Sequence, residues 1–253
     1  MSPFEGVLLG VVQGVTEFLP VSSSGHLVLF QSWFGIAQSG ILFEVVLHVA
    51  TLGAVIVFFF PALRKLSLAK MSFLALGTLP AAVIGVLFKS QIETLFDSIL
   101  LVAIALLVTA ALNLGIAYYL RREQDLAVTW KRSLAIGVAQ AFAIVPGISR
   151  SGSTIFAGLQ TGLSRKTAFE FSFLLSIPAI GGALLLQVLE VLQRPSYIPL
   201  ITPMILGFIA AFVTGLFSLV LLKKILVTNK FSLFSWYTAT VAVVVLLFEL
   251  LGA

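Results

Sequence analysis

Apolar residues occur along this chain in runs of about 20, the length that an α-helix needs to cross the hydrocarbon core of a bilayer. Polar and basic residues are concentrated in the short segments between these runs. The pattern predicts an all-α integral membrane protein with a single membrane domain, residues 1–253. Full crossings are expected at 41–60, 71–88, 98–120, 167–190, 199–222 and 232–251.

One early stretch, GVVQGVTEFLPVSSSGHL at residues 10–27, begins like a membrane helix and stops too soon. Pro20 ends the first helix, because proline disfavours helical geometry at the residue before it and donates no backbone hydrogen bond. A serine-rich tip follows, and a second apolar run begins at Leu27. We therefore predict a re-entrant helical hairpin at about 4–35, with two half-helices and a polar tip inside the membrane.

The same pattern returns in GVAQAFAIVPGISRSGST at residues 137–154, which aligns without gaps on 10–27. The Phe43-Glu44 pair likewise recurs as Phe169-Glu170. Self-similarity at half the chain length indicates an internal duplication, with one repeat at about 1–126 and the other at about 127–253. The identical pairs in the two tips are Gly10 and Gly137, Val11 and Val138, Gln13 and Gln140, Ser22 and Ser149, Ser24 and Ser151, and Gly25 and Gly152.

Each repeat is expected to hold one re-entrant hairpin and three transmembrane helices. Because three is odd, the second repeat lies upside down relative to the first, the inverted-topology plan in which broken helices meet near the midplane. Basic loops face the cytoplasm, and the loop charges are strongly skewed, which places both termini on the extracytoplasmic side. One side collects Arg64, Lys65, Lys70, Arg121, Arg122, Lys131, Arg132, Arg165, Lys166, Lys223, Lys224 and Lys230, and the other only Lys89 and Arg194.

Composition agrees with a membrane protein and restricts its chemistry. Hydrophobic residues make up 60% of the 253 residues and charged residues 10%, and the mean hydropathy is +1.15. The chain has no cysteine and two histidines, which excludes disulfides, thiolate metal sites and multi-histidine metal sites. The net charge of +5 reflects basic cytoplasmic loops, so nucleic acid is not an expected partner.

The two tips are predicted to form one polar site. In the alignment Glu17 faces Ile144 and Ser23 faces Arg150, so one tip supplies an acid and the other a guanidinium. Free N–H groups at helix starts bind phosphate, and a guanidinium binds it with two parallel hydrogen bonds. The groups expected at this site are Glu17, Ser22, Ser23, Ser24 and His26 from the first tip, and Ser149, Arg150, Ser151, Ser153 and Thr154 from the second.

Structural interpretations of the same residues stay open. Serines that precede a helix are most often N-caps, and Arg150 could form an ion pair with Glu17 instead of binding phosphate. Gln13 lies four residues before Glu17 on the same helical face, and together they could hold a divalent cation that bridges phosphate oxygens. His26 could move a proton, and a tip serine could attack phosphorus.

A second acidic pair, Glu44 and Glu170, occurs near the start of a crossing in each repeat. These residues either support the neighbouring tip or lie at a helix interface. His48 follows Glu44 by one helical turn and is expected to pack or to support a neighbour rather than to catalyse.

Four segments resemble the undecaprenyl-diphosphatase family, the bacitracin-resistance membrane phosphatases. EFLPVSSSGH (17–26) and PGISRSG (146–152) are similar to the two signature motifs, and FEVVLHVATL (43–52) and SRKTAFEFSFLLSIP (164–178) also resemble that family. The resemblance implies hydrolysis of undecaprenyl diphosphate to undecaprenyl phosphate and phosphate, which recycles the lipid carrier for peptidoglycan synthesis. It also implies a bacterial inner-membrane location, an active site open to the extracytoplasmic side, and competition by bacitracin, which sequesters the substrate.

By the same resemblance, Glu17 is the acidic catalytic or metal residue and Ser23 the candidate nucleophile. His26 is the acid/base and Arg150 the phosphate binder, and a divalent cation, Mg²⁺ or Ca²⁺, is required. Gln13 stands where the family's E/Q-x-x-x-E pattern has its first acidic position, which puts a two-carboxylate metal site in doubt. The expected substrate-binding residues are Ser22, Ser24, Gly25, Ser149, Ser151, Gly152 and Thr154.

Two questions stay open at this point. Inverted repeats with broken helices are chiefly a transporter architecture, so a secondary transporter, an anion channel or a lipid-phosphate flippase is the competing function. For hydrolysis, the i, i+3 spacing of Ser23 and His26 suggests that His26 takes the serine proton, whereas the alternative nucleophile is an activated water. The sequence does not decide between a monomer and a homodimer.

Overall fold

The computed structural model describes residues 1–36, 40–122, 124–193, 201–228 and 230–251. Within these ranges every regular element is a helix, which confirms the predicted all-α class. The helices are α1 (Pro3–Phe18), α2 (Ser23–Trp33), α3 (Gly40–Phe58), α4 (Phe60–Leu63), α5 (Leu68–Leu87), α6 (Lys89–Leu95), α7 (Ile99–Tyr119), α8 (Trp130–Phe142), α9 (Arg150–Gln160), α10 (Arg165–Gln193), α11 (Ile201–Thr228) and α12 (Ser232–Leu251).

Five of the described helices, α5, α7, α10, α11 and α12, are long and apolar enough to cross a membrane. Their outward faces carry large apolar side chains such as Leu79, Val213 and Leu247, each more than half exposed on the isolated chain. The protein is therefore a multi-pass membrane protein. The crossing predicted at 41–60 is shorter than the others, because the apolar part of α3 covers only Leu42–Phe58 and the helix is interrupted at Phe59.

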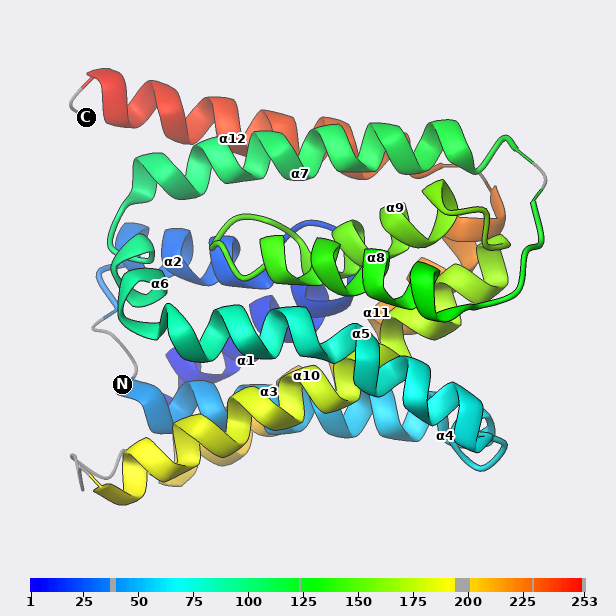
Figure 1. The fold of residues 1–253 in the computed structure, drawn as a ribbon. Helices are drawn as coiled ribbons and strands as arrows, with labels where there is room; N and C mark the ends of the chain where they lie inside the picture. The colour runs from blue at the N-terminus through cyan, green and yellow to red at the C-terminus, as the bar shows by residue number, and fades with distance from the viewer. Residues whose placement is uncertain (37–39, 123, 194–200, 229, 252–253) are drawn as a thin grey trace.

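Two pairs of shorter helices lie among the long ones (Figure 1). Residues 19–22 join α1 to α2, and residues 143–149 join α8 to α9. Leu19 adopts an extended backbone before Pro20, so α1 ends where the sequence predicts. In the second connection Gly147 has a φ of 95°, a left-handed conformation that favours glycine.

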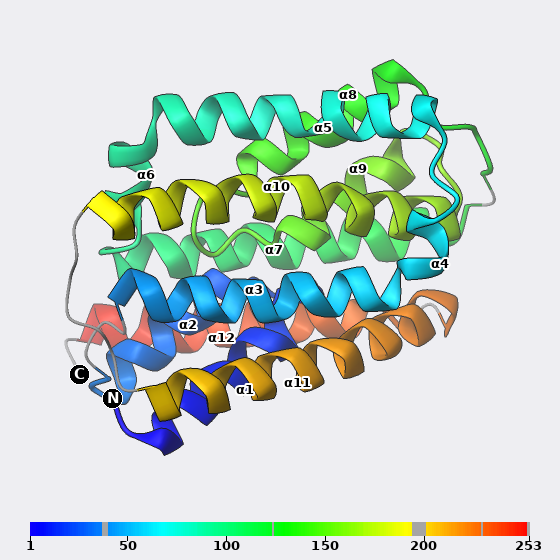
Figure 2. The same ribbon diagram turned by 90° about the horizontal axis from the view of Figure 1, so that it is seen from below.

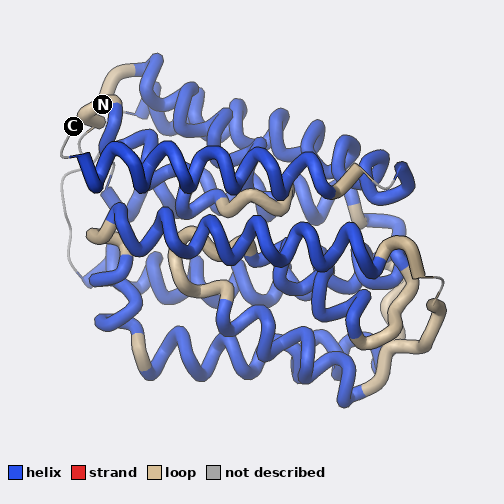
Figure 3. Tube along the Cα trace, turned by 90° about the horizontal axis from the view of Figure 1, so that it is seen from above, coloured by secondary structure: helices blue, strands red, loops and turns tan. Residues whose placement is uncertain are grey.

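The two pairs begin at opposite ends of the bundle. Figures 1 and 2 show both chain termini and α6 at one end, and α4 and the turn between α11 and α12 at the other. The first pair starts at the end that holds the termini, and α8 starts at the far end. In the tube view the loop segments that join the half-helices lie in the interior, between long helices (Figure 3).

Each first half-helix packs against a long helix of the other half of the chain. α1 packs on α11, and correspondingly α8 packs on α5, while α7 and α12 pack on each other. The approach is so close that a Cβ atom added to Gly10 would lie 2.4 Å from the carbonyl oxygen of Gly207. A Cβ added to Gly137 would lie 2.4 Å from that of Gly77. Small residues permit such backbone contact between membrane helices, where dispersion rather than water exclusion drives packing.

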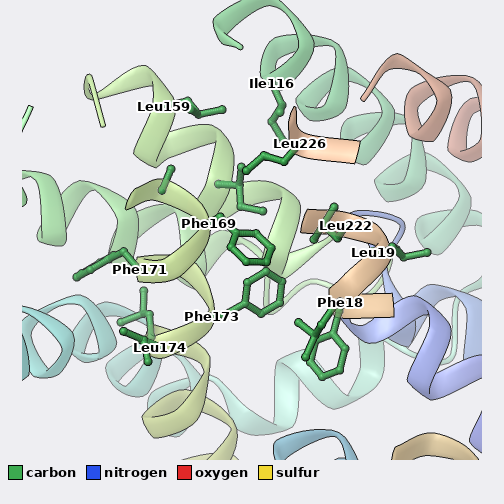
Figure 4. Packing of buried hydrophobic residues seen from close by; sticks show 14 of the residues in the cluster. Phe18, Leu19, Ile116, Leu159, Phe169, Phe171, Phe173, Leu174, Leu222 and Leu226 are labelled. Atoms are coloured by element: carbon green, nitrogen blue, oxygen red, sulfur yellow. The ribbon is translucent and has the colours of Figure 1, made fainter. Parts of the chain in front are cut away.

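The largest apolar cluster lies beside the first connection. Phe18, the last residue of α1, has no exposed surface and meets Phe173 of α10 edge to face, with ring centroids 5.7 Å apart. Phe173 also contacts Phe59 and Phe169, and Leu222 and Leu226 of α11 belong to the same cluster (Figure 4). Because this packing anchors the residue next to Glu17, the carboxylate of Glu17 is held on a rigid helix end.

Candidate active site

The carboxylate of Glu17 is the centre of the polar site. It is 7% exposed and accepts three hydrogen bonds. Ser23 Oγ donates to Oε2 at 2.6 Å, and Gln13 Nε2 donates to the same oxygen at 3.1 Å. Arg150 Nη2 donates to Oε1 at 2.6 Å, which closes an ion pair between the two halves of the chain. Charge-assisted bonds of this length are about twice as strong as neutral ones, so the four groups form one unit.

The two tips repeat the same local hydrogen bonds. Ser22 is the N-cap of α2, and its hydroxyl accepts from Gly25 N at 3.3 Å. Ser149 is the N-cap of α9, and its hydroxyl accepts from Gly152 N at 3.1 Å. A capping hydroxyl satisfies one of the backbone donors that a helix start leaves without a partner. These two serines therefore act as N-caps, as one interpretation of the sequence expected. The side chain of the next residue in each tip takes no part in the cap.

Those next residues are Ser23 and Arg150, the first residues of α2 and α9. They are aligned in the two repeats, and both reach Glu17. Helix geometry leaves the backbone N–H groups of these first residues without an intrahelical acceptor. The site therefore combines two helix starts, a hydroxyl, a carboxylate and a guanidinium, which is a set suited to phosphate chemistry.

The tips also touch each other directly, as the sequence predicts. A Cβ added to Gly25 would lie 3.1 Å from the Cα of Gly147, and one added to Gly152 would lie 3.4 Å from Cβ of Pro20. Ser151 Oγ donates to the carbonyl of Leu19 at 3.4 Å. The glycines shared by the two motifs thus permit contact between the tips.

Family membership follows from comparison of the whole chain with known proteins. A family model described as "Bacitracin resistance protein BacA" matches residues 6–244, which include both tips. The chain belongs to the BacA family. The family inferred from the sequence motifs is thereby confirmed.

Curated relatives of this BacA-family protein carry one description. An undecaprenyl-diphosphatase of Desulforapulum autotrophicum is 37% identical over 275 residues, with 96% of this chain and 97% of the relative covered. Relatives with the same description from Desulfosudis oleivorans and Thermosipho africanus are 40% and 39% identical. Each alignment covers 94% of this chain, and 95% and 97% of the respective relatives.

His26 and Ser23 are bonded to other groups in this BacA-family structure, although their spacing in the sequence suggested that His26 takes the serine proton. Its Nδ1 is 2.8 Å from the carbonyl oxygen of Ser22, and its Nε2 is 2.9 Å from the hydroxyl of Tyr237 on α12. Ser23 instead donates to the charged acceptor Glu17 at 2.6 Å. The i, i+3 spacing allows contact between the two side chains, but the Glu17 carboxylate is a stronger acceptor for the serine hydroxyl. The imidazole instead bonds to the backbone carbonyl of Ser22, one turn earlier.

Most other predicted binding residues are buried and bonded within the BacA fold. Thr154 Oγ1 lies 2.6 Å from the hydroxyl of Ser172, Ser153 donates to the carbonyl of Ser149 at 2.8 Å, and Ser151 is 1% exposed. By contrast, three polar side chains of the tips, those of Ser23, Ser24 and Arg150, are partly exposed. These three are the tip groups that a ligand can meet first.

The mirrored acids have partners other than the Glu17 unit. Glu170 is 3.8 Å from Lys70 in a partly exposed ion pair between α10 and α5. His48 contacts the backbone of Glu44, with Nδ1 2.9 Å from the carbonyl oxygen. Glu170 therefore lies at a helix interface, between α10 and α5, rather than supporting a tip.

Two residues of α7 hold the tips, and the sequence did not single them out. Thr109 Oγ1 donates to the carbonyl of Gly147 at 2.7 Å and accepts from Ser149 N at 2.9 Å. One turn later, Asn113 Nδ2 donates to the carbonyl of Pro20 at 2.7 Å. Both side chains are fully buried. The sequence does contain a signal for these contacts, because two polar residues one turn apart in an otherwise apolar crossing indicate a buried polar contact.

Proposed function

We propose that this protein hydrolyses undecaprenyl diphosphate to undecaprenyl phosphate and inorganic phosphate. The observation that carries the proposal is the Ser23–Glu17–Arg150 arrangement between two helix starts. The relatives described as undecaprenyl-diphosphatases over nearly the whole chain support it. The product would return the lipid carrier to peptidoglycan and other envelope synthesis.

Ser23 is the proposed nucleophile, and Glu17 is the proposed base. Glu17 Oε2 takes the proton of the Ser23 hydroxyl, to which it is bonded at 2.6 Å. The Ser23 oxygen forms a bond to the terminal phosphorus, and the bond between that phosphorus and the bridging oxygen breaks. Undecaprenyl phosphate leaves with the electron pair of the broken bond. Water then attacks the phosphoserine phosphorus, and the bond between that phosphorus and the Ser23 oxygen breaks to release inorganic phosphate. His26 is proposed to take the proton of the water, and Glu17 returns its proton to the serine oxygen.

Arg150 is the proposed phosphate binder. Its Nη2 contacts Glu17, while its Nη1 is buried and has no hydrogen-bond partner among the described residues. A buried donor atom without a partner costs free energy, and a phosphate oxygen is a suitable acceptor for this one. The N–H groups at the starts of α2 and α9, the hydroxyl of Ser24 and the capped backbone around Gly25 and Gly152 would complete the binding surface.

A divalent cation, Mg²⁺ or Ca²⁺, is proposed to act with this site. Among the described residues no group of three His, Asp or Glu side chains comes together. However, Gln13 Oε1 is buried without a partner, next to the Glu17 carboxylate that its amide nitrogen contacts. These two hard oxygen donors fit a cation that keeps water and phosphate as its other ligands. When bound, it would neutralise charge on the phosphate oxygens.

The proposed topology is an inverted repeat with two re-entrant hairpins. The paired packing of α1 on α11 and α8 on α5, the shared serine-to-glycine capping bond and the opposite entry of the hairpins support it. The end that holds α4 and the turn before α12 carries the basic loops, so it would face the cytoplasm. Both termini and the opening of the active site would then face outward from a bacterial inner membrane. Bacitracin would compete by sequestering the substrate. A homodimer is the proposed alternative to a monomer, and the mass of the purified protein in detergent distinguishes the two.

The deciding experiment measures phosphate release by the purified full chain in detergent with undecaprenyl diphosphate and Mg²⁺ or Ca²⁺. We expect equal amounts of inorganic phosphate and undecaprenyl phosphate. The matched control is the Ser72→Ala variant, which removes an exposed hydroxyl bonded to the backbone of Ala69 far from the tips. Lipid or anion passage in proteoliposomes without phosphate release would overturn the proposal in favour of a transporter or channel.

A further inference from the structure

The hydrogen bond between His26 and Tyr237 joins the first tip to the last helix. His26 Nε2 lies 2.9 Å from the Tyr237 hydroxyl, and the two rings are stacked, with centroids 5.6 Å apart and planes 11° from parallel. His26 is 3% exposed, whereas Tyr237 is 47% exposed. A residue that follows the tip by more than 200 positions therefore contacts the imidazole through both its ring and its hydroxyl.

The partners of the imidazole fix where its proton lies. The carbonyl oxygen of Ser22, 2.8 Å from Nδ1, can only accept a hydrogen bond, so Nδ1 carries a proton. In the neutral imidazole Nε2 is then the basic nitrogen, and the Tyr237 hydroxyl must donate to it. When Nε2 is protonated, the same hydroxyl can turn and accept. Tyr237 can thus remain bonded to His26 in both protonation states without any movement of the ring.

We propose that Tyr237 is a positioning residue that, together with the Ser22 carbonyl, keeps His26 in the Nδ1-protonated tautomer, with Nε2 as its basic nitrogen. The proposal rests on the acid–base role of His26 in the proposed hydrolysis. Stacking fixes the plane of the imidazole, and the hydroxyl fixes its direction. In known metal sites, a second residue orients the metal-binding histidine through a hydrogen bond. Removal of that residue lowers metal affinity or activity by about ten- to a hundred-fold.

Nitrogen NMR of histidine tests the geometry without any turnover. The chain has two histidines, so a His48→Gln variant assigns the signals of His26 in ¹⁵N-histidine-labelled protein. We expect a protonated Nδ1 and an unprotonated, hydrogen-bonded Nε2. Tyr237→Phe keeps the stacked ring and removes the hydroxyl, so the Nε2 resonance should move to higher frequency. An unprotonated Nδ1, or an Nε2 signal that Tyr237→Phe does not move, would overturn the proposal.

Kinetics test whether this geometry serves the reaction. Tyr237→Phe should lower kcat by about ten- to a hundred-fold and leave KM within about twofold. Combined with His26→Gln, it should cost nothing further, because the two residues act as one unit. Tyr118→Phe is the matched control, since its hydroxyl contacts Arg122 at the end of α7 and should leave kcat unchanged.

A wild-type kcat in Tyr237→Phe, or losses that multiply in the double variant, would contradict a positioning role. If the wild-type protein released no phosphate at all, the proposed hydrolysis would be wrong. The NMR experiment would still show whether Tyr237 is hydrogen-bonded to His26 Nε2. Failure of one proposal is therefore distinguishable from failure of the other.

Discussion

Ser23 and Arg150 occupy equivalent positions in the two hairpins and donate to opposite oxygens of one carboxylate. Each is the first residue of its half-helix, directly after a capping serine. The two capping serines make the same side-chain hydrogen bond, although Ser22 has a φ of 72° and Ser149 a φ of −73°. The two tips therefore share their caps and differ in the next residue, whose side chain reaches Glu17 in both.

Replacement of Ser23 by alanine tests the nucleophile. If the serine oxygen attacks phosphorus, Ser23→Ala should lower kcat by several orders of magnitude, whereas loss of one hydrogen-bond donor costs on the order of 10²–10³. Phosphate release at saturating substrate and cation is the measurement. A residual rate within about tenfold of the wild type would instead assign the attack to a water activated by Glu17 or His26.

Arg150→Lys separates phosphate binding from a purely structural ion pair. Lysine keeps the charge that faces Glu17 but lacks the planar fork and the second terminal nitrogen. We expect activity to fall by about two orders of magnitude, with the melting temperature in detergent close to that of the wild type. If expression and thermal stability collapse together with activity, the role of Arg150 is the ion pair itself.

Glu17→Gln tests the link between the acid and the cation. The amide cannot act as the base for Ser23 and is a weaker cation ligand, so we expect loss of activity and a flattened dependence of the remaining rate on Mg²⁺ or Ca²⁺. Gln13→Glu adds a second carboxylate beside the first and should lower the cation concentration that gives half-maximal activity. An unchanged cation response in both variants would restrict Glu17 to proton transfer.

Gly10→Ala and Gly137→Ala should destabilise the fold by similar amounts. In each case the new methyl group would lie 2.4 Å from a backbone oxygen of the facing helix, and overpacking of this kind typically costs about 1–3 kcal/mol. Gly181→Ala is the control, because its added methyl would meet no atom within 4 Å and alanine favours a helix. Melting temperatures in detergent provide the comparison, and equal stabilities of all three variants would contradict the packing argument.

The orientation in the membrane can be read with single cysteines, since the chain has none of its own. Gln91 and Leu126 are both exposed; Gln91 belongs to α6 and Leu126 to the segment between α7 and α8, and these two elements lie at opposite ends of the bundle (Figure 1). An impermeant thiol reagent added to intact cells should label Gln91→Cys and leave Leu126→Cys unlabelled until the cells are opened. Labelling of position 126 from outside would reverse the proposed topology.

The helix order and the meeting of the tips could be predicted because both depend on local signals. Pro20 inside an apolar run predicts a broken helix wherever it occurs, and a gapless repeat of the motif predicts a second one. The same reasoning placed Glu17, Ser23 and Arg150 together, since each lies within three residues of a tip. These residues were found because sequence neighbours determine where a helix starts and stops.

What the sequence did not give are contacts between distant segments of similar composition. Tyr237, Thr109 and Asn113 each lie in an apolar crossing, and nothing local says which polar group they face. The choice of Ser23 between His26 and Glu17 is of the same kind, because it depends on the angle between α1 and α2 rather than on spacing. Such contacts depend on how whole helices are placed relative to one another, which residue patterns do not encode.

Because α1 packs on α11 and α8 packs on α5, the two halves of the chain exchange packing partners as the subunits of a covalently linked dimer would. The glycine face of each first half-helix is covered by a helix of the other half. Two separate polypeptides, cut near residue 126, should therefore accumulate only when they are produced together. Reassembly of such a split enzyme would recover the Glu17–Arg150 contact across the subunit boundary, and with it a site to which each subunit contributes one tip.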